Sequence, residues 1–311
     1  MTLLFAIRHL IFSTTKDKYT LLLRVNNIIN LRTPMLKLLR NITLLFCLFL
    51  LASCASEKVS DIFYLESSIA LVEASPKLDI YLPKKSENNP VVIFIHGGYW
   101  EEGNKGMYGF LGRGLANKGI TTVIPNYTLS PNGSYHTMAE EVAAAVQWTH
   151  DSIAKHNGNS DQIFLMGHSA GGHLIALVGT NPKYLETTDM VKGIILNDAA
   201  ALDMNSYLQE NPPTKNHNYD VTWTQDPTNW KDASPIYFLS EKVPPMLIYV
   251  GTKTYPSIIS QNKDFVEELK KYQPTAEINY LTKKHVPMMS QYIYPWNKHY
   301  KEIIAFVERN K

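Results

Sequence analysis

Short, continuously apolar segments recur at intervals from about residue 90 to the end of the chain. The clearest is VVIFI at residues 91–95, which is rich in β-branched residues and shows no polar alternation. Such a run is typical of a strand whose two faces are both buried. The same pattern predicts further strands at residues 121–125, 162–166, 191–196, 246–250 and 277–281.

Longer segments with a helical spacing of apolar positions separate these strands. The longest covers residues 137–156 and carries Val142 and Val146 on one side. Two short strands, at residues 61–66 and 78–82, are expected to pair antiparallel at one edge. Strands that alternate with helices predict an α/β fold, with a mostly parallel central sheet and helices on both faces. The other helices are expected at residues 109–118, 171–179, 257–272 and 298–309.

Residues 205–234 interrupt this alternation. They are rich in Asn, Pro and Thr, but they also hold Tyr207, Tyr219, Trp223 and Trp230. Active sites of parallel sheets lie beyond the carboxyl ends of the strands. We therefore expect this segment to form a small cap insertion over such a site.

Composition narrows the class of protein. The 311 residues are 45% hydrophobic and 19% charged, which is ordinary for a globular chain and excludes a disordered one. The net charge of +2 is uneven, because residues 1–53 hold seven Lys or Arg and one acid, leaving 23 basic and 27 acidic residues beyond them. Those lysines are dispersed, which argues against nucleic-acid binding. Two cysteines are too few for a disulfide scaffold or a Cys-rich zinc site, and we expect no metal and no cofactor.

Residues 35–53 have the organisation of a signal peptide. Lys37 and Arg40 give a positive start, residues 42–52 are apolar, and small residues precede Cys54. At about 1.5 Å rise per residue this apolar stretch covers only about half of a bilayer core of roughly 30 Å. It is therefore too short for a stable transmembrane helix.

The sequence LASC at residues 51–54 resembles the lipobox of bacterial lipoproteins. The resemblance implies cleavage before Cys54 and acylation of its thiol, and hence a lipid-anchored protein of the cell envelope. Ala55 rather than Asp follows, which favours the outer membrane or the periplasmic face. The alternative is an ordinary secretory signal with a buried cysteine.

The expected organisation of the chain follows from these segments. Translation is expected to start at Met35, which makes residues 1–34 an over-extended N-terminus. The signal peptide occupies residues 35–53, a polar tether residues 54–60, and one α/β domain residues 61–311.

The sequence GHSAG at residues 167–171 matches the pattern G-x-S-x-G and lies between a predicted strand and a predicted helix. A serine at such a sharp turn projects its hydroxyl into the open, and the flanking glycines allow strand and helix to pack closely. This context predicts that Ser169 is a nucleophile.

A second glycine motif, HGGYW at residues 96–100, follows the strand at 91–95. Its glycines allow backbone N–H groups to point toward the space that the Ser169 hydroxyl enters. The N–H groups of Gly98, Tyr99 and Ala170 are therefore expected to form an oxyanion hole. His96 itself is expected to have a structural role.

Together with NYTLSP at residues 126–131, GHSAGGH at 167–173 and a late histidine, the HGGYW motif resembles the α/β-hydrolase superfamily. The similarity is greatest to the hormone-sensitive-lipase-like esterases and the kynurenine-formamidase-like branch, and it covers roughly residues 60–310. It implies the α/β-hydrolase fold and acyl hydrolysis by a Ser–His–acid triad without a cofactor.

The chain order Ser, acid, His places the base after the last strand. His285 directly follows the predicted strand at 277–281, whereas the later His299 falls inside the predicted terminal helix. His168 and His173 are too close to the nucleophile in sequence to reach its hydroxyl easily, so we expect them to be structural. His285 is therefore the predicted base.

The acid departs from the family pattern. A carboxylate is expected three residues after Gly251, but that position holds Thr254, and the next carboxylate is Asp264. Either the acid is displaced or the triad is weakened or lost. Asp198, soon after the neighbouring strand, is the candidate displaced acid that could reach His285. Alternatively, Asp198 is a loop residue whose side chain caps a turn.

These observations predict a lipid-anchored serine carboxylesterase that acts on small-molecule esters. Two alternatives remain: an amide or aryl-formamide hydrolase of the kynurenine-formamidase type, and a non-catalytic surface-binding lipoprotein with a degenerate hydrolase site.

Overall fold

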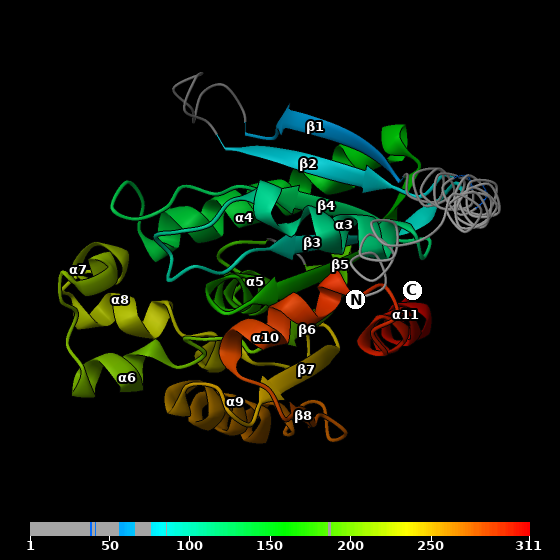
Figure 1. Cartoon of the computed structure of the whole chain (residues 1–311). Coiled ribbons are helices and arrows are strands. Elements are labelled where there is room, and N and C mark those ends of the chain that lie inside the picture. The colour runs from blue at the N-terminus through cyan, green and yellow to red at the C-terminus, as the bar shows by residue number, and fades with distance from the viewer. Residues whose placement is uncertain (1–37, 39–40, 42–55, 66–75, 85, 186–187) are drawn as a thin grey trace, which may run out of the picture. The chain divides into compact units, whose positions relative to one another are not determined.

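An eight-stranded sheet forms the centre of the computed structural model (Figure 1). The strand order is β1-β2-β4-β3-β5-β6-β7-β8. β1 pairs antiparallel with β2 and β2 antiparallel with β4, and every other neighbouring pair is parallel. The strands are β1 Glu57–Phe63, β2 Lys77–Leu82, β3 Asn89–Ile95, β4 Thr121–Pro125, β5 Gly158–His168, β6 Val191–Asn197, β7 Met246–Gly251 and β8 Ile278–Leu281. The predicted α/β fold with a mostly parallel sheet is confirmed.

The structure describes residues 38, 41, 56–65, 76–84, 86–185 and 188–311. Apart from Leu38 and Asn41, the expected over-extended N-terminus at residues 1–34, the signal peptide at 35–53 and Cys54 lie outside the described residues. They stay predictions. Within the described residues, no helix combines the length and the apolar character that crossing a bilayer requires.

The central strand β3 explains why its sequence is continuously apolar. Val91, Ile93 and Ile95 enter the hydrophobic core on one face of the sheet, whereas Val92 and Phe94 enter a second core on the other face. Successive side chains of a strand point to opposite faces, so burial of both faces requires an apolar residue at every position.

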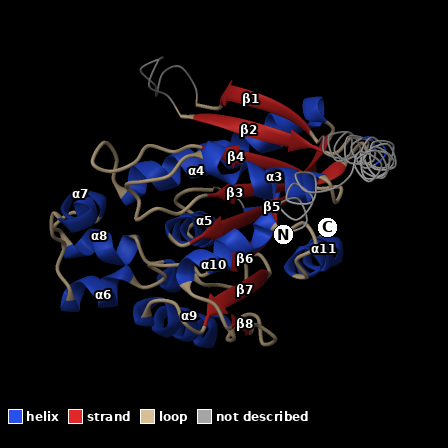
Figure 2. Ribbon diagram, in the orientation of Figure 1, coloured by secondary structure: helices blue, strands red, loops and turns tan. Residues whose placement is uncertain are grey.

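Helices supply the other half of each core (Figure 2). Residues of α4, α5 and α9 belong to the first core, and residues of α3, α10 and α11 belong to the second. The bounds are α3 Gly109–Ala116, α4 Tyr135–Ser152, α5 Ala170–Thr180, α9 Pro256–Leu269, α10 His285–Ser290 and α11 His299–Asn310.

The first strand begins earlier than predicted, so part of the expected tether at residues 54–60 belongs to the sheet. Residues 57–59 pair with residues 80–82 of β2. The register then shifts before Ile62, and Asp61 has a positive φ of 61°. This irregularity interrupts the alternation of side chains, which is why the sequence pattern placed the start of the strand at the wrong residue.

The cap insertion expected at residues 205–234 forms three short α-helices, which lie together at the left of Figure 1. They are α6 Met204–Glu210, α7 Tyr219–Thr222 and α8 Pro227–Asp232. Aromatic packing fixes them to the domain, because the fully buried Trp223 lies edge-on to Trp100 with ring centroids 4.7 Å apart. In addition, His173 Nε2 donates to the carbonyl of Ala233 at 2.7 Å.

Candidate active site

Ser169 lies at the sharp turn between β5 and α5, with φ 55° and ψ −120°. Such a conformation is strained for a residue with a side chain and needs support from its surroundings. The flanking glycines provide it. A Cβ on Gly167 would lie 2.4 Å from the Gly171 carbonyl oxygen, and a Cβ on Gly171 would lie 2.1 Å from the Ile95 carbonyl oxygen. The turn therefore excludes any larger residue at either position.

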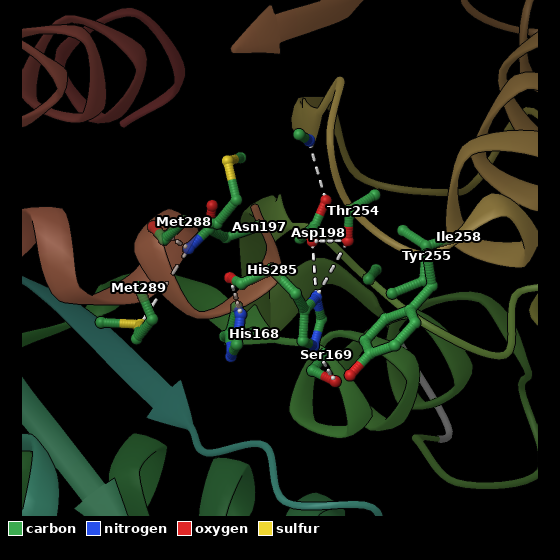
Figure 3. A network of polar contacts seen from close by, with 12 residues as sticks. His168, Ser169, Asn197, Asp198, Thr254, Tyr255, Ile258, His285, Met288 and Met289 are labelled. Carbon is green, nitrogen blue, oxygen red and sulfur yellow. Dashed lines mark hydrogen bonds and ion pairs between the residues drawn. The ribbon is translucent and has the colours of Figure 1, made fainter. Parts of the chain in front are cut away.

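One continuous chain of hydrogen bonds joins three of the predicted site residues (Figure 3). His285 Nε2 lies 2.8 Å from Ser169 Oγ, and His285 Nδ1 lies 2.5 Å from Asp198 Oδ2. Ser169 follows β5, Asp198 follows β6, and His285 is the first residue of α10. The expected contact between Asp198 and His285 is therefore present, and with Nδ1–H donating to Asp198, Nε2 is free to accept the Ser169 proton.

The Asp198 carboxylate is fully buried and has three hydrogen-bond partners. Oδ1 accepts the N–H of Gly251 at 2.8 Å, and Oδ2 accepts the Thr254 hydroxyl at 2.5 Å in addition to His285. A buried carboxylate requires such partners. Thr254 Oγ1 also lies 3.2 Å from His285 Nδ1. Sequence reasoning considered Thr254 as the residue at the expected place of the acid and as a weak acceptor, whereas in the structure its hydroxyl donates to Asp198, the candidate displaced acid.

The residue before the acid, Asn197, was also missed. Its Nδ2 donates to the backbone carbonyl of Met288 in α10 at 3.0 Å. On the other side, His168 Nε2 lies 3.3 Å from the backbone carbonyl of His285 itself. The ends of β5 and β6 thus fix the helix that carries the base. Neither contact could be read from the sequence, because the helix α10 was not predicted.

The loop that carries the expected oxyanion hole passes next to the nucleophile. A Cβ on Gly97 would lie 3.0 Å from the Cβ of Ser169, and one on Gly98, which has φ 130°, would lie 2.2 Å from the Glu102 carbonyl oxygen. Among the described residues, no backbone hydrogen bond uses the N–H of Gly98 or Tyr99. Ala170 is the first residue of α5, so its N–H has no partner within the helix. All three donors remain available to a developing negative charge.

The side chain of Tyr99 connects this loop to the cap. Its ring stacks on His217 with centroids 4.3 Å apart, and His217 in turn contacts the Glu101 carboxylate. The hydroxyl of Tyr99 lies 2.8 Å from that of Tyr255, which follows Thr254. Burial raises the pKa of Tyr99 to about 12, so the hydroxyl is neutral at physiological pH.

The three other buried histidines of the motifs have structural positions. Burial lowers the pKa of His168 to about 3 and the pKa values of His96 and His173 to about 4, so all three are neutral. His173 Nδ1 accepts the indole N–H of Trp100 at 3.2 Å. His299 lies at the start of α11, where its Nδ1 contacts Glu302 at 2.7 Å.

Two cavities meet at Ser169 and His285. The first, of about 150 Å³, lies under the cap and is called the cap pocket. The second, of about 340 Å³, lies beside α10 and is called the outer pocket. The cap pocket is lined by Trp100, Met204, Tyr207, Tyr219, Tyr255 and Ile258 among others. The outer pocket is lined mainly by apolar residues, including Met107, Tyr108, Phe110, Val286, Met289 and Ile293.

In the described part of the chain, no three His, Cys, Asp or Glu side chains are grouped so that they could hold a metal ion.

Comparisons with known proteins agree with this architecture. The family model BD-FAE matches residues 78–269, which is more than half of the chain. Kynurenine formamidase of Danio rerio is 36% identical over 122 residues, which cover 39% of this chain and 40% of that protein. The chain therefore matches less than half the length of that relative. Esterase LipC of Mycobacterium tuberculosis is 28% identical over 223 residues, covering 66% of this chain and 54% of LipC.

Among solved structures, an esterase of the archaeon Pyrobaculum calidifontis superposes with a TM-score of 0.63 at 20% identity, over 82% of this chain and 83% of that chain. The propionate-bound esterase Est2 of Thermogutta terrifontis gives 0.65 at 19% identity, over 82% and 94%. At these identities the likeness establishes the fold.

Proposed function

Because the chain belongs to the BD-FAE family of α/β-hydrolases, we propose that it is a serine carboxylesterase acting on small-molecule carboxylic esters. The observation that carries this proposal is the unbroken hydrogen-bonded chain from Ser169 through His285 to the buried Asp198. Cavities on both sides of the nucleophile offer separate space for the acyl and alcohol parts of an ester.

In the proposed reaction, His285 Nε2 takes the proton of Ser169 as its Oγ attacks the ester carbonyl carbon. The resulting oxyanion accepts hydrogen bonds from the N–H groups of Gly98, Tyr99 and Ala170, each worth about 10²–10³ in rate in comparable sites. His285 then protonates the leaving alcohol, and water attacks the acyl-enzyme in the same way. Asp198 keeps the imidazole in the required tautomer and stabilises its cationic form.

We expect a fluorophosphonate probe to label Ser169, because among the described serines it is the one whose hydroxyl contacts a histidine ring nitrogen. Ser169→Ala should abolish labelling and lower kcat on a short p-nitrophenyl ester by at least about 10⁴-fold. Ser257→Ala, which changes another serine of the cap pocket, is the matched control and should still be labelled. Full turnover by Ser169→Ala, or an adduct elsewhere, would refute Ser169 as the nucleophile. A wild-type protein that shows neither labelling nor turnover would favour the non-catalytic binding protein.

An amide-cleaving function is the second candidate, favoured by the similarity to kynurenine formamidase. The same nucleophile and oxyanion hole would serve a formamide, but the leaving amine must be protonated before it departs. Comparing kcat/KM on phenyl acetate and on formanilide decides between them. We expect the ester to be preferred.

The proposal extends to the location of the enzyme: Cys54 is acylated and anchors the protein in the cell envelope. The lipobox-like LASC at residues 51–54 supports it, and two or more acyl chains anchor stably at about 0.8 kcal/mol per buried methylene. Protein expressed in a Gram-negative bacterium should partition into Triton X-114 detergent, and Cys54→Ala should not be processed to the lipidated form. Unprocessed wild-type protein with its N-terminus at Met1 would contradict both the anchor and the start at Met35.

A further inference from the structure

The most exposed large apolar side chains of residues 56–311 concentrate in one region. Among the large hydrophobic residues that the structure describes in this range, the exposed fraction is greatest for Trp296 at 80%, Val286 at 69%, Met107 at 60%, Tyr294 at 55% and Ile293 at 54%. Four of these five lie within residues 286–296, which directly follow the proposed catalytic base. A concentration of this kind indicates an interaction surface rather than scattered exposure.

Three of these side chains are continuous with the site. Met107, Val286 and Ile293 line the outer pocket together with Ser169. Tyr294 is the next residue after Ile293, and its ring lies 5.6 Å from that of Trp296. Met107, Val286 and Ile293 therefore lie at the outer end of the pocket that leads to the nucleophile. Tyr294 and Trp296 line a second hollow, together with Lys283 and Lys298. We call these five apolar residues the rim.

The charge near the rim is positive although the protein beyond residue 53 carries four more acids than bases. Residues 282–298 include Lys283, Lys284 and Lys298 and contain no Asp or Glu. Lys298 lies 3.8 Å from the partly exposed Glu302, a loose contact, and Glu102 is the carboxylate beside the outer pocket. Three lysines against these two acids leave the rim with a positive balance.

We propose that the rim docks on an anionic lipid surface, so that the outer pocket opens toward the lipid layer. Tyr and Trp are the side chains that favour the water–lipid boundary, and each lysine close to anionic lipid contributes about 1 kcal/mol. The aliphatic members Met107, Val286 and Ile293 fit acyl chains and do not fit a hydroxyl-rich polymer. The docking stands on these residues, whereas delivery of a lipid-borne ester to Ser169 rests on the proposed function.

The test uses residues 56–311, which contain the whole sheet and both hydrophobic cores and so form one folding unit without the N-terminal anchor. Ser169→Ala is included so that no lipid ester is consumed. Sedimentation with phosphatidylcholine vesicles containing phosphatidylglycerol should pull down the protein, and binding to pure phosphatidylcholine should be at least about tenfold weaker. Raising the salt concentration should weaken the anionic binding.

Variants locate the contact. Trp296→Ser with Tyr294→Ser should weaken binding to anionic vesicles by roughly tenfold or more, since both side chains lose apolar contact with lipid. Tyr272→Ser is the matched control, because Tyr272 is exposed in the turn after α9 and is not part of the rim. Thermal melts followed by circular dichroism verify that the variants are folded.

Equal binding by wild type and the rim variant, or no binding to anionic vesicles, would overturn the proposal. So would a dimer in sedimentation velocity that the rim variant abolishes, because it would assign the rim to a second copy of the chain. Since binding is measured on the Ser169→Ala protein, these outcomes are independent of whether the wild type is an esterase.

Discussion

At the scale of single residues, two positions contact the imidazole nitrogen that the family pattern assigns to one carboxylate. Asp198 supplies the charge from the end of β6, and Thr254 stands where the family acid is expected. The threonine hydroxyl donates to Asp198 and lies within 3.2 Å of the same imidazole nitrogen that the acid contacts. The two positions therefore converge on His285 Nδ1.

This convergence predicts that the acid can be moved. Asp198→Asn should lower kcat on a short ester by about 10⁴-fold, since an amide neither stabilises the imidazolium nor fixes the tautomer. Adding Thr254→Asp should raise the kcat of the Asp198→Asn variant at least about tenfold, because a carboxylate at position 254 can accept a hydrogen bond from His285 Nδ1. Steady-state kinetics on the single and double variants measure both effects.

Thr252→Asp in the same Asp198→Asn background is the control, because Thr252 is exposed on the same loop and contacts neither residue. It should restore nothing. If Asp198→Asn leaves kcat unchanged, the assignment of the acid is wrong, and a Ser169–His285 dyad with Thr254 as a weak acceptor becomes the better description.

Motif order singled out Ser169 and His285, whose Oγ and Nε2 lie 2.8 Å apart in the structure, because the strand that precedes each one fixes its place at the sheet edge. Asp198 was found by adjacency of strands, a weaker argument. The role of Thr254 could not be predicted, since the direction of its hydrogen bond depends on how closely the loops after β6 and β7 approach.

At the scale of elements, continuous apolar runs located several strands closely. β3 and β4 are buried on both faces and their sequence runs were recognised to within two residues. α10 was missed because it has six residues, too few for a periodic pattern, and includes Pro287. A proline is tolerated in the first turn of a helix, where its missing N–H has no partner to lose. The predicted base, His285, is therefore the first residue of a helix.

Side chains join the cap to the loop at residues 96–101, which carries the expected oxyanion donors. The hydrophobic periodicity of the sequence does not reveal these contacts. Glu101, directly after HGGYW, contacts His217 and accepts the Asn218 amide at 2.8 Å. His217 and Asn218 both have positive φ values, which turns them back toward the loop. Since Tyr99 stacks on His217, the position of the cap and that of an expected oxyanion donor are coupled through adjacent residues.

At the scale of the whole molecule, the glycine motifs bring histidines into the interior. His96, His168 and His173 are all buried, and burial lowers the pKa of His168 to about 3 and those of the other two to about 4. Their usual value in an unfolded chain is about 6.5. Between about pH 6.5 and pH 4 the unfolded chain therefore binds protons at three positions that the folded protein leaves neutral.

This difference sets the pH dependence of stability. Where the unfolded state binds more protons, the free energy of unfolding rises with pH, so the contribution is complete above about pH 6.5 and is lost as the pH falls. Each histidine should account for about 1.4 kcal/mol per pH unit in the lower part of this window. Urea unfolding of residues 56–311 at pH 7, 6 and 5 should give steeply decreasing free energies.

His173→Asn isolates one of the three contributions, because an amide can still accept from the Trp100 indole and donate to the Ala233 carbonyl. The variant should be less stable at pH 7, where a smaller side chain leaves a gap in the packing. Between pH 6 and pH 5, however, its stability should fall less steeply than that of the wild type, by about 1.4 kcal/mol per pH unit. Parallel curves for the wild type and His173→Asn would mean that His173 takes up its proton in the folded protein as readily as in the unfolded chain, and that its burial does not control its charge.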